Sequence, residues 1–522
     1  MFRNSTSSGR VTRRGLLQGA AAGGLLLGAN GLPMPARAAP KKGGMLRIGK
    51  AHGQTTDTLD PATYENGFTN AISHAVHGRM TEVGADGQLK PEVAESWEAS
   101  DDASVWRFKL RSGMTFHNGA PVTVADVVAS INYHRGEDST SAAGPIVKPI
   151  KDVGVDGDVI VFTLDGGNAD FPFILSDYHL TICPADGDSI DWKSGVGCGS
   201  YKLVEFNPGV IARFEKFADH WDADNRAWIE QIEMLSIIDQ NARTTALVSG
   251  DVHAIDRLDL KTAGLMGRRK GVNIHSVSGT QHYTFAMSSN QDPYTDVNVR
   301  LALKYGVNRQ EMVDKILFGY GALGNDHPIG SGQRYFNQDL AQREYDPDRA
   351  KFHLKEAGLD SVSVALSASD AAFGGAVDAA VLFQASAKSA GIELEPVREP
   401  KDGYWSDVWM KKPFSAVYWG GRPVEDQMFA TAYQCGAAWN DSFWCNDRFE
   451  ELLVSARAEL DQDKRRAMYY EMQEIVSNDG GVIIPMFASY VFATNDDVGI
   501  PDQFGSNWDM DGERWTERWW MA

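Results

Sequence analysis

The chain has 522 residues, of which 43% are hydrophobic and 23% charged, and its 50 basic against 70 acidic side chains give a formal net charge of −20. A chain of this length is too long for one hydrophobic core, so we expect two or more globular units. The negative surface repels phosphate backbones and anionic lipid, which argues against a nucleic-acid partner.

The first segment has the pattern of an export signal. Thr12-Arg13-Arg14-Gly15-Leu16-Leu17 is a twin-arginine motif, an apolar Gly/Ala-rich stretch covers 16–32, and Ala36-Arg37-Ala38 is a small-x-small cleavage site. The apolar stretch is near the short limit for a membrane-spanning helix, but it is rich in glycine and ends in proline. We therefore predict a signal over residues 1–38 that is cleaved after twin-arginine export, and a mature protein in the periplasm.

Strands and helices are both predicted in the first half of the mature chain. In Val105–Leu110 apolar and basic side chains alternate, which predicts a half-buried strand. Thr123 and Asp126 form a capping box that opens a helix through about His134. Further strands are predicted at Met45–Lys50 and Val159–Leu164.

Helices dominate the predictions for the second half, and together the elements indicate an α/β or α+β class. Asp346 is a predicted N-cap, with proline at the first helical position and Gly358 closing the helix. The other predicted elements are a helix from Asp296 through Leu317, a helix from Ala376 to Ala390, a helix capped by Asp447 with Glu450, a helix from Asp461 to Ser477 and a strand at Tyr490–Thr494.

The sequence contains no G-x-S-x-G, H-E-x-x-H, P-loop or dinucleotide-binding motif. His74 and His77 are spaced to share a helix face, but no nearby Cys or Glu pattern supports a metal site. We therefore expect no catalytic residue, no cofactor and no metal. A secreted hydrolase is the alternative from a different class, and it would need a nucleophile and a base that meet in a cleft.

Two segments carry a family resemblance. Leu89-Lys-Pro-Glu-Val-Ala-Glu-Ser-Trp-Glu-Ala-Ser-Asp-Asp102 and the following 106–128 resemble the signature of the peptide/nickel family of periplasmic binding proteins, family 5. Matching segments follow in the family's order at 197–206, 239–251, 299–309 and 345–351, with Cys198 and Ser200 as departures. The resemblance covers nearly all of the mature chain.

The resemblance implies an α/β, two-lobe periplasmic binding protein fold of type II, with an extra inserted subdomain and a hinge of two strands. Lobe I would comprise 39–280 and 488–522, with the insertion at about 57–180, and lobe II would comprise 281–487. It also implies a function as a monomeric binding component that delivers a small ligand to the permease subunits of an ABC importer, and not as an enzyme. A peptide or peptide-like solute is the first expectation, and an acidic or opine-like conjugate or an oligosaccharide is the alternative.

The segment Val417-Tyr-Trp-Gly-Gly-Arg-Pro-Val-Glu-Asp-Gln-Met-Phe429 resembles the family's ligand segment. In dipeptide-binding relatives the position three after the Trp is an Asp that pairs with the peptide's ammonium group, and here it is Arg422. A guanidinium pairs with a carboxylate or phosphate, not with an ammonium. The alternative is that Arg422 pairs with Glu425 or Asp426 and never meets ligand.

A second departure points the same way. The family's carboxylate-binding Arg precedes the glycine that matches Gly391, and counting back lands on Val377 and Asp378 instead. We therefore expect a ligand with an anionic group on Arg422. A Trp-rich wall could add stacking. The ligand-contact candidates are Gln54, Thr55, Tyr283, Trp405, Trp419, Arg422, Asp426, Trp439 and Asn440, the last of which could instead shape its turn together with Asp441.

The four cysteines fall into two pairs that are close in sequence. Export places them where disulfides persist, and short loops close most easily, so we predict the bonds Cys183–Cys198 and Cys435–Cys445. Dipeptide-binding relatives also have paired cysteines that flank the segment resembling Cys435 to Cys445.

Overall fold

The computed structural model describes residues 40–137, 139–187, 189–401, 403–422 and 424–522, so the predicted signal lies outside the described residues. Residues from Pro40 to Ala522 form one compact unit. In the described ranges no helix is both long and apolar enough to cross a membrane. Strands and helices are mixed along the whole of this unit, in agreement with the predicted α/β class.

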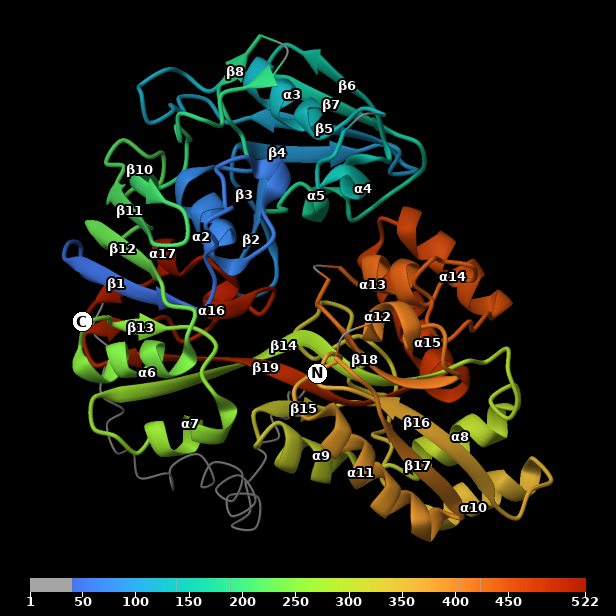
Figure 1. Ribbon diagram of the computed structural model, residues 1–522. Helices are drawn as coiled ribbons and strands as arrows, with labels where there is room; N and C mark the ends of the chain where they lie inside the picture. The colour runs from blue at the N-terminus through green and yellow to red at the C-terminus, as the bar shows by residue number, and fades with distance from the viewer. Residues whose placement is uncertain (1–39, 138, 188, 402, 423) are drawn as a thin grey trace, which may run out of the picture. The chain divides into compact units, whose positions relative to one another are not determined.

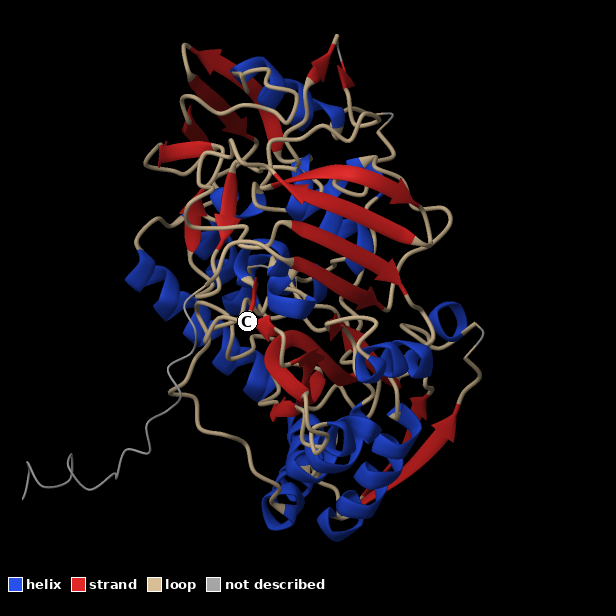
Figure 2. Ribbon diagram, turned by 90° about the vertical axis from the view of Figure 1, so that its left-hand side faces the viewer, coloured by secondary structure: helices blue, strands red, loops and turns tan. Residues whose placement is uncertain are grey.

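One sheet of eleven strands runs through the molecule. Its strands lie side by side in the order β10 (Tyr201–Asn207), β11 (Ile211–Lys216), β12 (Gln231–Ser236), β1 (Met45–Lys50), β13 (Ala254–Ile255), β19 (Val482–Asn495), β14 (Val272–Met287), β18 (Phe414–Trp419), β16 (Val362–Ala368) and β17 (Ile392–Arg398), and β15 (Gly321–Leu323) pairs with β19. Figure 2 shows β10, β11, β12 and β1 next to one another. The sheet is mixed, because β1 pairs in parallel with β12 and β13 whereas β14, β18 and β19 pair antiparallel.

The long strands β14 and β19 connect two groups of elements (Figure 1). Residues 272–278 of β14 pair with 489–495 of β19, and the register then shifts between Ser278 and His282. Beyond the shift, His282 pairs with Phe487. The shift marks the place where both strands pass from a first group of elements, which includes β1 and β12, to a second group, which includes β16 and β18.

The first group contains two main hydrophobic clusters. One lies between the sheet and helices from both ends of the chain: α2 (Gly67–Val76), α16 (Asp509–Gly512) and α17 (Trp515–Arg518). The other belongs to a separate antiparallel sheet in the order β4 (Ala94–Ala99), β5 (Val105–Leu110), β7 (Val159–Leu164) and β6 (Ile150–Asp156), covered by α3 (Val124–Tyr133) and α5 (Phe171–Ile174). Trp106 and Phe108 of β5 are buried in this second cluster, as the alternation predicted.

The second group is built on both faces of the sheet, because successive strand residues point to opposite sides. Ile483 of β19 packs with α8 (Val297–Tyr305), α9 (Arg309–Ile316), α10 (Pro347–Glu356) and α11 (Ala376–Ala387). Its neighbours Val482 and Ile484 pack with α13 (Glu425–Ala432), α14 (Asp447–Ala458) and α15 (Gln462–Asp479). In Figure 1 these two sets of helices lie on opposite sides of β18 and β16.

Shorter elements complete the chain. They are a 3-10 turn at Pro61–Thr63, β2 (Thr81–Val83), β3 (Leu89–Pro91), α4 (Gly144–Val147), β8 (Ala185–Asp186), β9 (Ser189–Ile190), α6 (Gln240–Ser249), α7 (Leu260–Met266), a 3-10 turn at Lys388–Ala390, α12 (Tyr404–Asp407), β20 (Val498–Gly499) and β21 (Trp520–Met521).

Two predicted helices need correction. The helix predicted from Asp296 through Leu317 is two helices, because the chain leaves the helical path after Gly306 and Asn308 then caps α9 by accepting from the Glu311 amide. The cap of α14 is Asn446, whose side chain accepts from the Phe449 amide, and Asp447 is the first helical residue instead.

The cysteine prediction is half wrong. Cys435 and Cys445 are bonded, whereas Cys183 and Cys198 are free buried thiols. Their sulfur atoms face different neighbours: that of Cys183 lies 3.7 Å from His77 Nδ1, and that of Cys198 lies 4.0 Å from the Ile182 carbonyl oxygen. Closeness in sequence favours loop closure only when the fold also turns the two side chains toward each other.

Candidate ligand-binding site

A cavity of about 420 Å³ lies where β18 ends, and we name it the Trp cavity. Its lining residues are Trp405, Trp409, Val417, Tyr418, Trp419, Gly420, Arg422 and Trp439. The volume is in the range of pockets that hold small molecules, and the wall is mostly aromatic with one charged group. It therefore has the character of a binding site for a small ligand.

Three elements position these aromatic rings. Tyr418 and Trp419 point to opposite sides of β18, so that Tyr418 is 42% exposed and Trp419 only 5% exposed. The short helix α12 carries Trp405, and it is fixed to β18 because the Tyr404 hydroxyl donates to the Ala416 carbonyl at 2.8 Å. Trp439 lies in the loop closed by the Cys435–Cys445 bond and is half exposed.

The rings contact one another mainly edge to face. The Trp405 ring centroid is 5.8 Å from that of Trp409 and 5.6 Å from that of Tyr418. The Trp439 ring centroid is 6.3 Å from the ring centroids of both Trp409 and Trp419. Tilted contacts of this kind fix the positions of the rings and leave parts of their faces turned to the cavity.

Asp441 lies behind this wall and holds two of its rings. Its Oδ2 accepts from the indole Nε1 of Trp409 at 3.2 Å and of Trp419 at 3.3 Å. Burial raises the pKa of Asp441 to about 7, and the two indole hydrogen bonds oppose that rise. Asp441 thus orients two rings of the cavity wall without lining the cavity itself.

Among the described residues, Arg422 supplies the only charge of the cavity wall. Its Nη1 donates to the carbonyls of Gly420 and Gly421, both at 3.2 Å, and no described carboxylate lies within ion-pair distance. The expected alternative, a pairing with Glu425 or Asp426, is wrong. Glu425 accepts from the Tyr335 amide, and Asp426 pairs with Arg457 at 3.0 Å.

Other predicted contacts lie elsewhere. Asn440 shapes its turn, because its amide donates to the Trp444 carbonyl at 2.7 Å. Tyr283 stacks on Phe373 with centroids 4.1 Å apart. Gln54 and Thr55 lie near the turn at Gly209 between β10 and β11.

The structure therefore brings together Trp405, Trp419, Trp439 and Arg422 of the predicted set, and not Gln54, Thr55, Tyr283, Asp426 or Asn440. Sequence reasoning missed Trp409 and Tyr418 as wall residues. Trp409 follows Trp405 by four positions and Tyr418 immediately precedes Trp419, so both could have been found from their neighbours.

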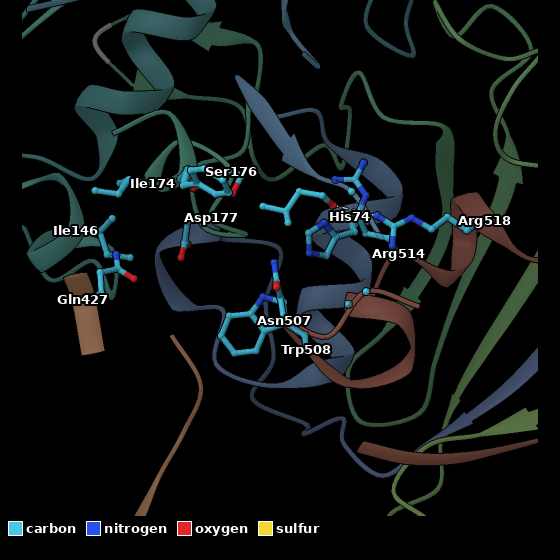
Figure 3. Close-up of a pocket in the computed structure, with 15 residues that line it drawn as sticks. His74, Ile146, Ile174, Ser176, Asp177, Gln427, Asn507, Trp508, Arg514 and Arg518 are labelled. Carbon is cyan, nitrogen blue, oxygen red and sulfur yellow. Dashed lines mark hydrogen bonds between the residues drawn. The ribbon is translucent and has the colours of Figure 1, made fainter. Parts of the chain in front are cut away.

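A smaller cavity of about 40 Å³ lies between α2, the segment after α5 and the segment that leads into α16. Figure 3 shows His74, Asp177 and Trp508 around it, with Gln427 of α13 on another side. Tyr178 packs against Trp508 with ring centroids 5.4 Å apart. The first group of elements thus meets α13 of the second group at this cavity.

His74 lies in α2 and His77 is the C-cap residue of this helix. Both are buried, and burial holds their pKa values well below the ordinary value. Among the described residues no group of three or more His, Cys, Asp or Glu side chains could hold a metal ion.

The fold and this geometry can be compared with known proteins. Residues 88–441, more than half of the chain, match the bacterial extracellular solute-binding proteins, family 5. The chain belongs to this family. Its relatives include the dipeptide-binding protein of Escherichia coli (strain K12), 24% identical over 474 residues that cover 82% of this chain and 86% of the relative. Glutathione-binding protein GsiB of Salmonella typhimurium is 24% identical over 452 residues, with the same coverage of 82% and 86%.

Solved structures show the same fold. The binding protein AgaA of A. tumefaciens R10, in complex with agropinic acid, aligns with a TM-score of 0.70 and 22% identity over 92% of this chain and 99% of that one. The murein tripeptide binding protein MppA, in its unliganded open form, aligns with a TM-score of 0.78 and 18% identity over 88% and 94%. The family 5 protein described here therefore has the two-lobe periplasmic binding protein fold, and it is a solute-binding component of an ABC importer and not an enzyme.

A buried ion cluster joins distant parts of this family 5 protein. Asp170, just before α5, accepts from Arg465 of α15 through both oxygens at 2.9 and 2.7 Å, and from Arg334 at 2.6 Å. Burial alone would raise the pKa of Asp170, but the two guanidiniums hold it below its ordinary value. Nearby, the Ala169 amide donates to the Arg457 carbonyl at 2.7 Å. These contacts tie the segment before α5 to α14 and α15.

Proposed function

We propose that this family 5 protein binds a peptide-like solute with an anionic group, and that Arg422 holds this group at the edge of the Trp cavity. The observation that carries the proposal is the half-buried guanidinium of Arg422, which has hydrogen bonds to backbone carbonyls and no carboxylate partner in the described part of the chain. A charged donor of this kind is suited to a carboxylate or a phosphate.

The names of relatives support this class of ligand. Dipeptides and glutathione are peptides with free carboxylates, and they are what two relatives bind by name. Agropinic acid, bound by a structural neighbour, suggests an acidic opine-like conjugate as one form of such a solute. A neutral oligosaccharide is the second candidate, because the four indoles of the cavity offer stacking surfaces for sugar rings.

Native mass spectrometry of the purified protein tests the proposal, because binding proteins of this kind often retain their ligand. We expect a retained small solute with at least one carboxylate or phosphate. Retention of a neutral sugar would favour the second candidate. Retention of a plain free-amine dipeptide whose binding does not depend on Arg422 would contradict the proposed contact.

The proposal includes two lobes that close on the ligand. Lobe I would comprise 39–280 and 488–522, with an inserted subdomain at about 57–180, and lobe II would comprise 281–487. The register shift between Ser278 and His282 of β14, where the hydrophobic clusters also change, supports a hinge at this point. Small-angle scattering with and without ligand tests the closure.

We also propose that the protein is exported by the twin-arginine route, works in the periplasm as a monomer and delivers its solute to the permease subunits. The Arg13-Arg14 pair and the apolar stretch after it support this route. Replacing both arginines with lysine should stop export of the protein, and continued export of that variant would contradict the route. Light scattering after size exclusion would give the mass of the mature protein in solution and test the monomer.

A further inference from the structure

The wall of the Trp cavity has an unusual chemistry for a pocket that only buries apolar groups. Of its eight described lining residues four are tryptophan and one is tyrosine, while Val417 is the single aliphatic side chain among them. Indole faces carry negative electrostatic potential and attract cations, most strongly where water is excluded. A purely apolar group would be held equally well by aliphatic side chains.

Asp441 adds a negative charge directly behind two of these rings. It is 4% exposed, and in the described part of the chain no Lys or Arg lies within ion-pair distance of it. It accepts hydrogen bonds from Trp409 and Trp419 through their indole N–H groups. A charged acceptor on an indole N–H increases the electron density of the ring, and a buried carboxylate without a counter-charge is costly. Both effects would favour a cation on the other side of the rings.

The protein does not fill this position itself. Its own cations lie over other rings, such as Arg111 over Trp221, Arg334 over Tyr335 and Arg465 over Tyr469. Among the described residues none lies over the four indoles of the Trp cavity. The faces of these rings are therefore available to a ligand.

We propose that the Trp cavity binds a cationic, weakly hydrated group of the solute, such as a methylated ammonium, and that Asp441 is its buried counter-charge. The inference rests on the proposed function, because the same solute would place its anionic group on Arg422 at the edge of the same cavity. The solute would then be a zwitterion whose anionic end lies between its own cation and Arg422. This anionic end screens the repulsion between the cation and the guanidinium. Such a ligand differs from a plain dipeptide, whose ammonium group relatives are expected to hold with an acidic residue at the position that matches Arg422.

Two probes of the same shape distinguish binding through a positive charge from binding through burial of apolar groups. Glycine betaine and 3,3-dimethylbutanoate carry the same carboxylate and the same three methyl groups. The methyl groups are attached to a positively charged nitrogen in betaine and to an uncharged carbon in 3,3-dimethylbutanoate. Titration followed by tryptophan fluorescence and calorimetry should show that betaine binds about tenfold more tightly or better. Equal binding, tighter binding of 3,3-dimethylbutanoate, or no betaine binding up to high millimolar concentration would overturn the proposal.

Two variants assign the effect to the named residues. Asp441→Asn keeps a hydrogen-bond acceptor for the indoles and should remove most of the preference for betaine, with little change for 3,3-dimethylbutanoate. If this buried variant does not fold, the half-exposed Trp439 serves instead: Trp439→Leu should weaken betaine selectively, whereas Trp439→Phe should keep much of the preference. Equal loss for both probes in the folded variants would leave only a packing role for these residues and overturn the proposal.

The same titrations separate this inference from the proposed function. Arg422→Ala should weaken both probes alike, because both carry the carboxylate. If it does so while betaine shows no preference over 3,3-dimethylbutanoate, the anion contact stands and the cation subsite fails. If betaine is preferred but Arg422→Ala changes neither probe, the cation subsite stands and the proposed anion contact fails.

Discussion

Arg422 is a charged side chain whose hydrogen bonds to described residues go to neighbouring carbonyl oxygens of its own loop. Water can replace those bonds, so the fold depends little on this guanidinium, whereas an anionic ligand would depend on it strongly. Arg422→Ala should weaken binding of the retained ligand roughly a hundredfold, the order expected for a charge-assisted hydrogen-bonded pair. Calorimetric titration with the ligand identified by native mass spectrometry measures the change.

The matched control is Arg398→Ala. Arg398 is an exposed residue at the end of β17 and does not line the Trp cavity, so its removal should leave affinity unchanged. Arg422→Lys should fall between wild type and Arg422→Ala, because lysine keeps the charge but lacks the planar fork. Unchanged affinity in Arg422→Ala, with an unchanged melting temperature, would contradict the contact.

Asp441 gives a pH dependence whose sign follows from burial. Its pKa is about 7 in the folded protein against an ordinary value of 3.8. Above pH 7 the carboxylate is charged in both the folded and unfolded states, and its burial lowers the free energy of unfolding. As the pH falls from about 7 toward about 4, the folded state binds a proton before the unfolded state does, so this contribution to stability rises. Asp441→Asn should therefore be most stable relative to wild type near pH 8 and lose this advantage on acidification.

Thermal unfolding of both proteins across this pH range measures the difference. Glu513 has a similarly raised pKa of about 7, but it is present in both proteins and its contribution cancels in the comparison. Among the described residues, Asp441 faces Trp409, Trp419 and Tyr433, of which only the tyrosine titrates, and burial raises its pKa well above neutrality. A difference in melting temperature that stays constant with pH would show that the pKa of Asp441 is the same in the folded and unfolded states, which would contradict its rise on burial.

At the scale of elements, local signals predicted much of the secondary structure. Alternation gave the strand bounds of β5 correctly, and the capping box of Thr123 and Asp126 is present at the start of α3. The break between α8 and α9 was missed because the apolar pattern continues across it, although Gly306 and Asn308 carry a stop and a start signal. The long strand β14 was also missed, since its polar, glycine-containing centre has no clear strand pattern.

The candidate site was predictable only where its residues are close in sequence. The segment around Trp419 and Arg422 could be found from the family resemblance, and Trp405 and Trp439 from the density of tryptophan. Gln54 and Thr55 were placed by topology alone, and the structure puts them beside Gly209 instead. The role of Asp441 depends on two hydrogen bonds to rings on other elements, and no sequence pattern reports such contacts.

The loop closed by Cys435 and Cys445 carries Trp439 and Asp441, so its bond pattern is worth direct measurement. We expect a non-reduced digest to contain the Cys435–Cys445 link, with Cys183 and Cys198 as thiols. Burial raises the pKa of each thiol to about 12, so neither should react with an alkylating reagent in the native protein, and both should react after unfolding. The reaction of the unfolded protein is the control, and a Cys183–Cys198 link in the digest would contradict the structure.

At the scale of the whole molecule, two of the connections between the parts that we propose to be lobes bear on their closure. One is covalent and continuous, through β14 and β19. The other is the cluster of Asp170 with Arg334 and Arg465, which forms only when the segment before α5 meets α15. A hinge allows the lobes to separate, whereas the cluster holds them together, so the balance between open and closed forms should depend on Asp170.

Asp170→Asn tests this balance, because it keeps the shape of the side chain and removes the counter-charge of the buried Arg465, while Arg334 keeps, among the described residues, only Glu425 at 3.7 Å. Loss of one partner of a buried ion pair typically costs about 3–5 kcal/mol, and here that cost applies to the form in which the cluster is closed. The variant should therefore melt at a lower temperature. It should also have a larger radius of gyration than wild type at saturating ligand, as measured by small-angle scattering, and bind that ligand more weakly.

Asp156→Asn is the matched control for charge, since Asp156 pairs with Arg107 at the surface and is 71% exposed. Solvent screens such a pair, so neither the melting temperature nor the scattering profile should change. An Asp170→Asn protein that is less stable but has the wild-type radius of gyration, with and without ligand, would mean that the cluster stabilises the fold without controlling closure. A larger radius only at saturating ligand would instead place the cluster in the closed form, because that is the state in which the missing charge would be felt.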